Sequence, residues 1–457
     1  MIMDCCNKCL TGVLVTPRSK QQYEQARQEW NRAIQKFPMA IIYCFTVKDV
    51  SNAVCWARQN NVGIRIRSGG HNYEGFSTGN HILVIDVSPM KQISIDEANN
   101  TLYIQSGVRN SELYNYVGER GYPFPGGTCP TVGVAGYVMG GGWGYSSRYL
   151  GLGCDSLLEL EMVNYQGDII KANAQHNPDL FWASKGGGGG NFGVVTKMTF
   201  RLPAKVDRVT LIEFRYYYPS EDTMTAFLDN WQKWLIGLDN RMTINASLFN
   251  SAEEGMGIFG RGLYFGPFEE VEGLLELLFP EGFRFVHLRE LTFLEAMQII
   301  EESYPEYEKF QSTGRFVNRQ YSQTEIQNIV GLISQRAEGS VYTAITVYAL
   351  GGKVAAVGKR DTAFYYRDAA YIMGIQTVWE NNWYKRGNRY WLYEKFQYLK
   401  SITNGSYINF PYRFLTNYAR EYYGENARML QQINFWYDPM NVFRFPQAIS
   451  VIPFPFC

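Results

Sequence analysis

The chain contains 457 residues, in which 43 Lys and Arg side chains balance 43 Asp and Glu side chains. A chain of this length exceeds what one hydrophobic core comfortably fills, so two domains are expected. The balanced charge argues against nucleic-acid and anionic-membrane partners, and no apolar window approaches the ~18 residues that span a bilayer.

The first residues lack the basic region and the continuous apolar segment of a signal peptide. We therefore expect a cytoplasmic protein, or one that reaches a surface such as a spore coat without a signal peptide. Cys5, Cys6 and Cys9 crowd this end of the chain. Such a cluster could bind a metal, but no second ligand cluster lies nearby, so no metal is predicted.

The first part of the chain alternates helical and strand patterns. Apolar residues at spacings of three and four predict a helix over residues 21–37, which Pro38 ends. A strand over residues 40–45 precedes a helix that Asp49 or Ser51 could cap and that runs to Arg58. Further strands are predicted over residues 63–67, 82–86, 92–96, 101–105, 157–163 and 194–202, with a helix over residues 111–120.

After Pro203 the pattern changes to longer strands that alternate with amphipathic helices. Strands are predicted over residues 209–218, 242–249 and 341–350, and helices over residues 221–235 and 269–278. This pattern favours an antiparallel sheet backed by helices, which would form a substrate domain. The predicted fold class is therefore α+β.

Two glycine-bounded segments each present one nucleophilic side chain. Arg67-Ser-Gly-Gly-His-Asn-Tyr-Glu-Gly75 contains His71, and Gly126-Gly-Thr-Cys-Pro-Thr-Val-Gly-Val-Ala-Gly136 contains Cys129. Imidazole and thiolate are well suited to attack an electron-poor ring, although each residue alone more often has a structural role. Their joint context, with Gly140-Gly-Gly-Trp-Gly144 and a glycine run over residues 186–190, points to a cofactor site.

These motifs resemble the covalent flavin anchors of the berberine-bridge-enzyme-like FAD oxidases, in the vanillyl-alcohol-oxidase superfamily. The resemblance covers nearly the whole chain and implies a PCMH-type FAD-binding domain of two subdomains over residues 1–204. It further implies a substrate domain over residues 205–404. A C-terminal segment over residues 405–457 would return to pack on the FAD domain.

The resemblance implies FAD held by two covalent bonds, from His71 to the 8α-methyl carbon and from Cys129 to ring carbon 6. The backbone amides of residues 68–71 resemble the family's pyrophosphate loop, an anion nest. The expected cofactor-binding residues are Arg67, Ser68, Gly69, Gly70, His71, Asn72, Gly127, Thr128, Cys129, Val132, Gly133, Gly136, Gly140, Gly141, Gly144, Gly193, Val195 and Asn409.

Tyr407 lies in Tyr407-Ile-Asn409, which matches the family's Tyr-x-Asn motif, so it is the expected catalytic base. A second catalytic tyrosine, which the family places directly after the triple glycine, is replaced here by Trp143. Tyr145 could substitute for it, or Tyr407 could act alone.

By the same resemblance, Tyr73, Trp143, Thr346 and Tyr348 would line the substrate pocket, although sheet packing explains the last two equally well. Val132 occupies a position where a small side chain leaves room for dioxygen. The predicted function is an oxidase that moves a hydride from an alcohol or sugar hemiacetal to FAD and releases hydrogen peroxide. Two alternatives stay open: oxidation of an amine or secondary metabolite, including oxidative ring closure, and an inactive coat or binding protein.

Overall fold

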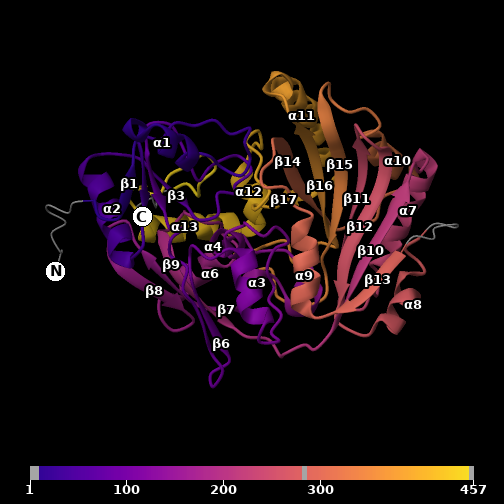
Figure 1. The fold of residues 1–457 in the computed structure, drawn as a ribbon, viewed down its shortest axis with the longest axis horizontal. Helices are drawn as coiled ribbons and strands as arrows, with labels where there is room; N and C mark the ends of the chain where they lie inside the picture. Colours follow the sequence, from indigo (N-terminus) through magenta and orange to yellow (C-terminus); the bar gives the residue numbers. More distant parts are fainter. Residues whose placement is uncertain (1–9, 280–285, 452–457) are drawn as a thin grey trace, which may run out of the picture.

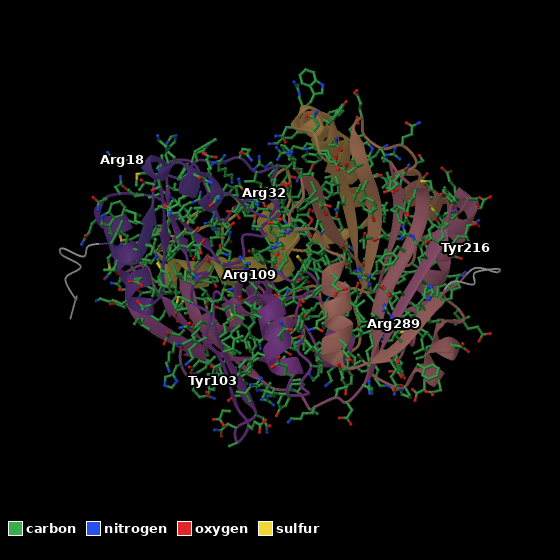
Figure 2. The ribbon with its side chains drawn as sticks, viewed as in Figure 1. Arg18, Arg32, Tyr103, Arg109, Tyr216 and Arg289 are labelled. Atoms are coloured by element: carbon green, nitrogen blue, oxygen red, sulfur yellow. The ribbon has the colours of Figure 1, made fainter. Side chains whose placement is uncertain are left out.

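The computed structural model describes residues 10–279 and 286–451, so the predicted N-terminal cysteine cluster lies outside the described residues. Figure 1 shows two parts side by side, one drawn mainly in indigo and purple and one around a large sheet drawn in pink and orange. Arg18 and Arg289 mark opposite parts of the molecule in Figure 2. Among the described residues, every helix is too short or too polar to span a bilayer.

The first part contains two sheets. A four-stranded sheet has the order β1-β2-β4-β3, in which β2, β4 and β3 run parallel. An antiparallel five-stranded sheet has the order β5-β6-β9-β7-β8. The strands are β1 (Val13–Val15), β2 (Ala40–Tyr43), β3 (Ile64–Arg67), β4 (Leu83–Asp86), β5 (Ile93–Asp96), β6 (Thr101–Gln105), β7 (Leu157–Val163), β8 (Ile169–Asn173) and β9 (Val194–Arg201).

The helices of the first part are short. They are α1 (Gln21–Ala26), α2 (Val47–Gln59), α3 (Asn110–Gly118), α4 (Val134–Met139), α5 (Ser147–Leu150) and α6 (Pro178–Ser184). The helix predicted over residues 21–37 is wrong beyond Ala26, because the next segment makes long-range backbone bonds instead: Trp30 donates to Gly70 and Arg32 donates to Glu308. The predicted caps of α2 are also corrected. Thr46 is the N-cap, and Asp49 completes its capping box.

The second part is one antiparallel sheet of eight strands, in the order β13-β10-β12-β11-β15-β16-β14-β17. Its strands are β10 (Val209–Tyr217), β11 (Met242–Ser251), β12 (Gly255–Tyr264), β13 (Val286–Leu291), β14 (Phe310–Val317), β15 (Ser340–Ala349), β16 (Tyr371–Trp379) and β17 (Asn404–Ser406). Its helices are α7 (Glu221–Trp234), α8 (Val271–Leu275), α9 (Phe293–Glu302), α10 (Gln323–Gly331) and α11 (Lys385–Ile402). The predicted α+β class is confirmed.

Within the predicted helix over residues 269–278, only α8 is α-helical, and a 3₁₀ turn precedes it at Phe268–Glu270. Gly273 lies inside this segment and lowers its helix propensity.

The last part of the chain contacts both halves. β17 pairs with β14 at the edge of the large sheet, whereas α13 (Ala427–Tyr437) packs against α6 in the first part. The Tyr437 hydroxyl lies 2.9 Å from a carboxylate oxygen of Asp179, the second residue of α6. The short α12 (Tyr418–Tyr423) lies between β17 and α13. The domain boundaries at residues 204 and 404 stay predictions.

The buried Arg148 joins the first part to the large sheet. Its guanidinium donates to the carbonyls of Met242 at 2.8 Å and Leu238 at 2.7 Å, and also to that of Leu350. Burial lowers the Arg148 pKa to about 10. Leu238 lies shortly before β11, Met242 is the first residue of β11, and Leu350 directly follows β15. One side chain therefore satisfies carbonyls at the ends of two strands.

We expect Arg148→Met to lower the free energy of unfolding by about 3 kcal/mol, because it leaves buried carbonyls without donors. Denaturant unfolding followed by circular dichroism measures the change. Arg360→Met is the matched control, since the Arg360 side chain is 78% exposed. Equal stabilities of the Arg148 and Arg360 variants would contradict this role.

Candidate active site

A cavity of about 630 Å³ is lined by residues from both parts of the molecule, a size typical of a ligand site. Most of the predicted site residues line it. They are Ser68, Gly69, Gly70, His71, Asn72, Tyr73, Gly127, Thr128, Cys129, Val132, Gly133, Gly136, Trp143, Tyr145, Gly193, Val195, Thr346, Tyr348, Tyr407 and Asn409. Segments more than 300 residues apart in the sequence therefore converge here.

Four predicted cofactor-binding residues are not among those that line the cavity. A Cβ on Gly140 would lie 2.0 Å from the Asn409 side chain, one on Gly141 would meet Phe364 and one on Gly144 would meet the Gly126 carbonyl. Arg67 is buried, with its guanidinium 2.6 Å from an Asp86 carboxylate oxygen and 3.4 Å from one of Glu29. These residues support the loops that line the cavity.

The two loops that carry His71 and Cys129 touch backbone to backbone. A Cβ on Gly69 would lie 2.2 Å from the Gly133 amide nitrogen, and one on Gly133 would lie 2.6 Å from that of Gly69. No side chain fits between them, so glycine is required at both positions. This contact brings the two nucleophiles into one wall of the cavity.

His71 and Cys129 meet at the hydroxyl of Thr131. The Thr131 Oγ1 atom lies 2.8 Å from His71 Nε2 and 3.8 Å from Cys129 Sγ. Both side chains are thus near enough to contact the same small ring system. Thr131 is a residue that the sequence reasoning missed, although it lies inside the quoted Cys129 motif.

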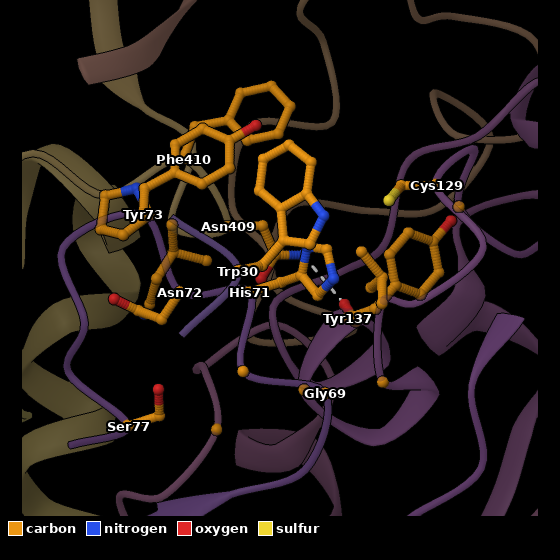
Figure 3. A pocket seen from close by; sticks show the side chains of 18 of the residues that line it. Trp30, Gly69, His71, Asn72, Tyr73, Ser77, Cys129, Tyr137, Asn409 and Phe410 are labelled. Atoms are coloured by element: carbon orange, nitrogen blue, oxygen red, sulfur yellow. Dashed lines mark hydrogen bonds between the residues drawn. The ribbon is translucent and has the colours of Figure 1, made fainter. Parts of the chain in front are cut away.

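The indole of Trp30 covers the His71 imidazole, with ring centroids 5.1 Å apart and planes 25° apart (Figure 3). Burial, together with the charge of Arg109, lowers the His71 pKa to about 3, so the imidazole is neutral at ordinary pH. Burial raises the pKa of the Cys129 thiol, while hydrogen bonds from Thr131 oppose that rise. A neutral imidazole can act as a nucleophile, and the contacts with Thr131 partly offset the effect of burial on the Cys129 thiol.

Glycines open a groove beside the two nucleophiles. A Cβ on Gly136, in α4, would meet no atom within 4 Å, and one on Gly190 would meet nothing nearer than 3.7 Å. The groove therefore leaves open space beside the protein backbone, which a dinucleotide needs in order to lie against the backbone amides. The residues present fit FAD, with the groove for its nucleotide and the His71 and Cys129 wall for its ring.

The Tyr407 hydroxyl is surrounded by N–H donors. It accepts hydrogen bonds from the backbone amides of Gly142 at 3.1 Å and Trp143 at 3.0 Å, and from the Asn409 side chain at 3.1 Å. Burial raises the Tyr407 pKa to about 12, and these donors oppose the rise. The arrangement is suited to stabilise negative charge on the phenol oxygen.

Trp143 and Tyr145 are both held by neighbours from the large sheet. The Trp143 indole donates to the Ala349 carbonyl at 2.7 Å, and the Tyr145 hydroxyl donates to the Asn245 side chain at 2.7 Å. Trp143 also packs edge-on against Tyr348, with centroids 4.9 Å apart. Tyr145 is therefore a fixed donor in the wall of the cavity.

The cavity also contains residues that the sequence reasoning did not select. Phe410 stacks on Tyr73 with centroids 5.2 Å apart and planes 4° apart (Figure 3). Glu308 lines the cavity from the loop before β14, and burial raises its pKa to about 7. Phe410 directly follows the quoted Tyr-x-Asn motif, but no local pattern distinguished Glu308. Among the described residues, no three His, Cys, Asp or Glu side chains form a metal site.

Comparison with known proteins agrees with this geometry. Residues 38–173 match the family described as FAD binding domain, and residues 406–450 match the family described as berberine and berberine like. An uncharacterized FAD-linked oxidoreductase of Bacillus subtilis, YgaK, is 35% identical over 446 residues, covering 96% of this chain and 97% of that protein.

Solved structures show the same fold. BBE-like 1 of Physcomitrella patens matches with a TM-score of 0.89 and 26% identity, covering 97% of this chain and 98% of that one. A carbohydrate oxidase from Microdochium nivale matches with a TM-score of 0.88 and 22% identity, covering 97% and 98% of the two chains.

Fold, cavity and relatives together define an FAD-dependent oxidoreductase. More closely, the chain belongs to the berberine-bridge-enzyme-like family of FAD-linked oxidases, as its sequence motifs predicted.

We expect Gly69→Ala to reduce the flavin content of the purified protein roughly tenfold, because the new Cβ must push the two close-packed loops apart. The ratio of flavin to protein absorbance measures the loss. Gly387→Ala is the control, since a Cβ there, within α11, meets nothing within 4 Å. Wild-type flavin content in the Gly69 variant would contradict the requirement for this contact.

Proposed function

We propose that the protein oxidises an alcohol or sugar hemiacetal, using FAD attached through both His71 and Cys129, and passes the electrons to dioxygen to give hydrogen peroxide. The observation that supports the double attachment best is the Thr131 hydroxyl, which lies 2.8 Å from His71 and 3.8 Å from Cys129. The fold shared with a carbohydrate oxidase agrees with a hydroxyl donor but does not identify it.

In this proposal, FAD held by His71 and Cys129 would supply the acceptor for the hydride that leaves the substrate carbon, and dioxygen would be the final electron acceptor. Tyr407 takes up the proton that leaves the substrate hydroxyl, acting as a phenolate that the amides of Gly142 and Trp143 and the side chain of Asn409 stabilise. Val132, which lines the cavity three residues after Cys129, leaves room for dioxygen.

The double attachment predicts a simple result for the anchor variants. His71→Ala and Cys129→Ala should each retain flavin after acid precipitation, because one bond remains, whereas the double variant should release it. Absorbance of the supernatant measures the released flavin, and flavin fluorescence of the protein on a denaturing gel measures the flavin that stays attached. A wild-type protein that releases all its flavin contradicts covalent attachment, and a colourless one favours the inactive coat or binding protein.

The base assignment predicts that Tyr407→Phe lowers turnover by about 10²–10⁴-fold, as loss of a general base does. Peroxide-coupled assays across mono- and oligosaccharides, uronic acids, aromatic alcohols and amines first identify a donor and then measure the loss. Tyr145→Phe is the comparison, since its hydroxyl is occupied by Asn245, and we expect it to retain more turnover.

Flavin content and thermal unfolding of the Tyr407 variant separate a catalytic effect from a structural one, because Phe leaves two backbone amides without their acceptor. If Tyr407→Phe keeps its flavin and more than about a tenth of its turnover, the base lies elsewhere.

A further inference from the structure

Glu308 is held in the cavity by its own backbone. It lies between α9 and β14, where its amide donates to Trp30 at 3.3 Å and its carbonyl accepts from Arg32 at 2.8 Å. Trp30 in turn covers His71. The Glu308 backbone is therefore fixed relative to the wall that would hold the flavin ring, and its side chain extends into the cavity lining from a defined position.

The Glu308 carboxylate has no cationic partner within the described residues. It accepts a long hydrogen bond from the side-chain amide of Gln376, in β16, at 3.4 Å. Three tyrosines feel its charge: besides burial, Glu308 raises the pKa values of Tyr73, Tyr304 and Tyr342, so that their phenols stay neutral. Every one of these groups also lines the cavity.

The two arginines that line the cavity are engaged elsewhere. Arg261 lies 2.7 Å from a Glu213 carboxylate oxygen and donates to Ser303 at 2.8 Å. Arg65 donates to the backbone carbonyls of Ile64 and Arg444. In the described part of the chain, Glu308 is thus the one acidic residue lining the cavity, and its charge is uncompensated.

A substrate that fills this cavity displaces the water around Glu308. An ionised carboxylate that loses water without gaining a partner is costly, whereas a cation brought by the substrate removes that cost. The neighbouring rings of Tyr73, Tyr342 and Phe310 add faces to which a cation is also attracted.

We propose that Glu308 forms an ion pair with a protonated amine of the substrate, so that the preferred donors are hydroxyl compounds that also carry a cationic nitrogen, such as amino alcohols or amino sugars. This inference rests on the proposed function, since it names the substrate class of the same cavity. It gives Glu308 a role in recognition, while proton transfer stays with Tyr407.

The test compares two probes of nearly equal shape, benzylamine and benzyl alcohol. Flavin-loaded protein is titrated anaerobically with each at pH ~8, above the Glu308 pKa of about 7, and the shift of the flavin absorbance band is followed. We expect the benzylammonium ion to bind about tenfold more tightly than benzyl alcohol. Added salt should weaken binding of the cation alone.

Glu308→Gln should remove the preference for the cation, because the amide keeps the shape but not the charge. Glu306→Gln is the matched control, since Glu306 lies two residues away on an exposed part of the same loop. If the Glu308 variant does not fold, the salt dependence in the wild-type protein still decides.

Equal affinities for the two probes, an unchanged preference in Glu308→Gln, or no flavin shift with either probe would each overturn the inference. These readouts need bound flavin but no turnover. Failure of the proposed function would instead appear as an absence of peroxide with every hydroxyl donor, so the two failures are distinguishable.

Discussion

The contact between Gly69 and Gly133 is the constraint on which the site depends. The first residue lies in the loop after β3 and the second directly precedes α4, so the contact joins two segments that the chain builds separately. Because neither residue has a Cβ, the two loops can approach closely enough for Thr131 to reach both His71 and Cys129. The two nucleophiles thereby lie in the same wall of the cavity.

Long-range backbone pairing fixes a second part of the cavity wall. The segment around Trp30 and Arg32 pairs with Glu308 instead of continuing as a helix. The Asn31 side chain extends this connection, since it donates to the carbonyls of Phe310 and Tyr73. One short segment therefore positions a ring over His71 and the backbones of Glu308 and Tyr73.

Predictions from sequence succeeded where the pattern was local. Strands such as β6 and β7 match their expected ranges, because alternation or a continuous apolar run reports burial directly. The prediction of a helix over residues 21–37 was wrong beyond Ala26, because the backbone there forms hydrogen bonds with distant segments, which no local pattern indicates. The predicted roles of Gly140, Gly141 and Gly144 stay predictions, since these residues do not line the cavity.

The sequence by itself determined the family, the α+β class and the two candidate flavin anchors, because glycine-rich motifs require specific residues at consecutive positions. Only the tertiary structure decided which side chains surround the substrate space. Glu308, Gln376 and Trp30 come from distant segments, and their meeting depends on strand order and loop pairing. Among the described residues, the lack of a counter-charge beside Glu308 is likewise a property of three-dimensional neighbours, which spacing along the chain does not reveal.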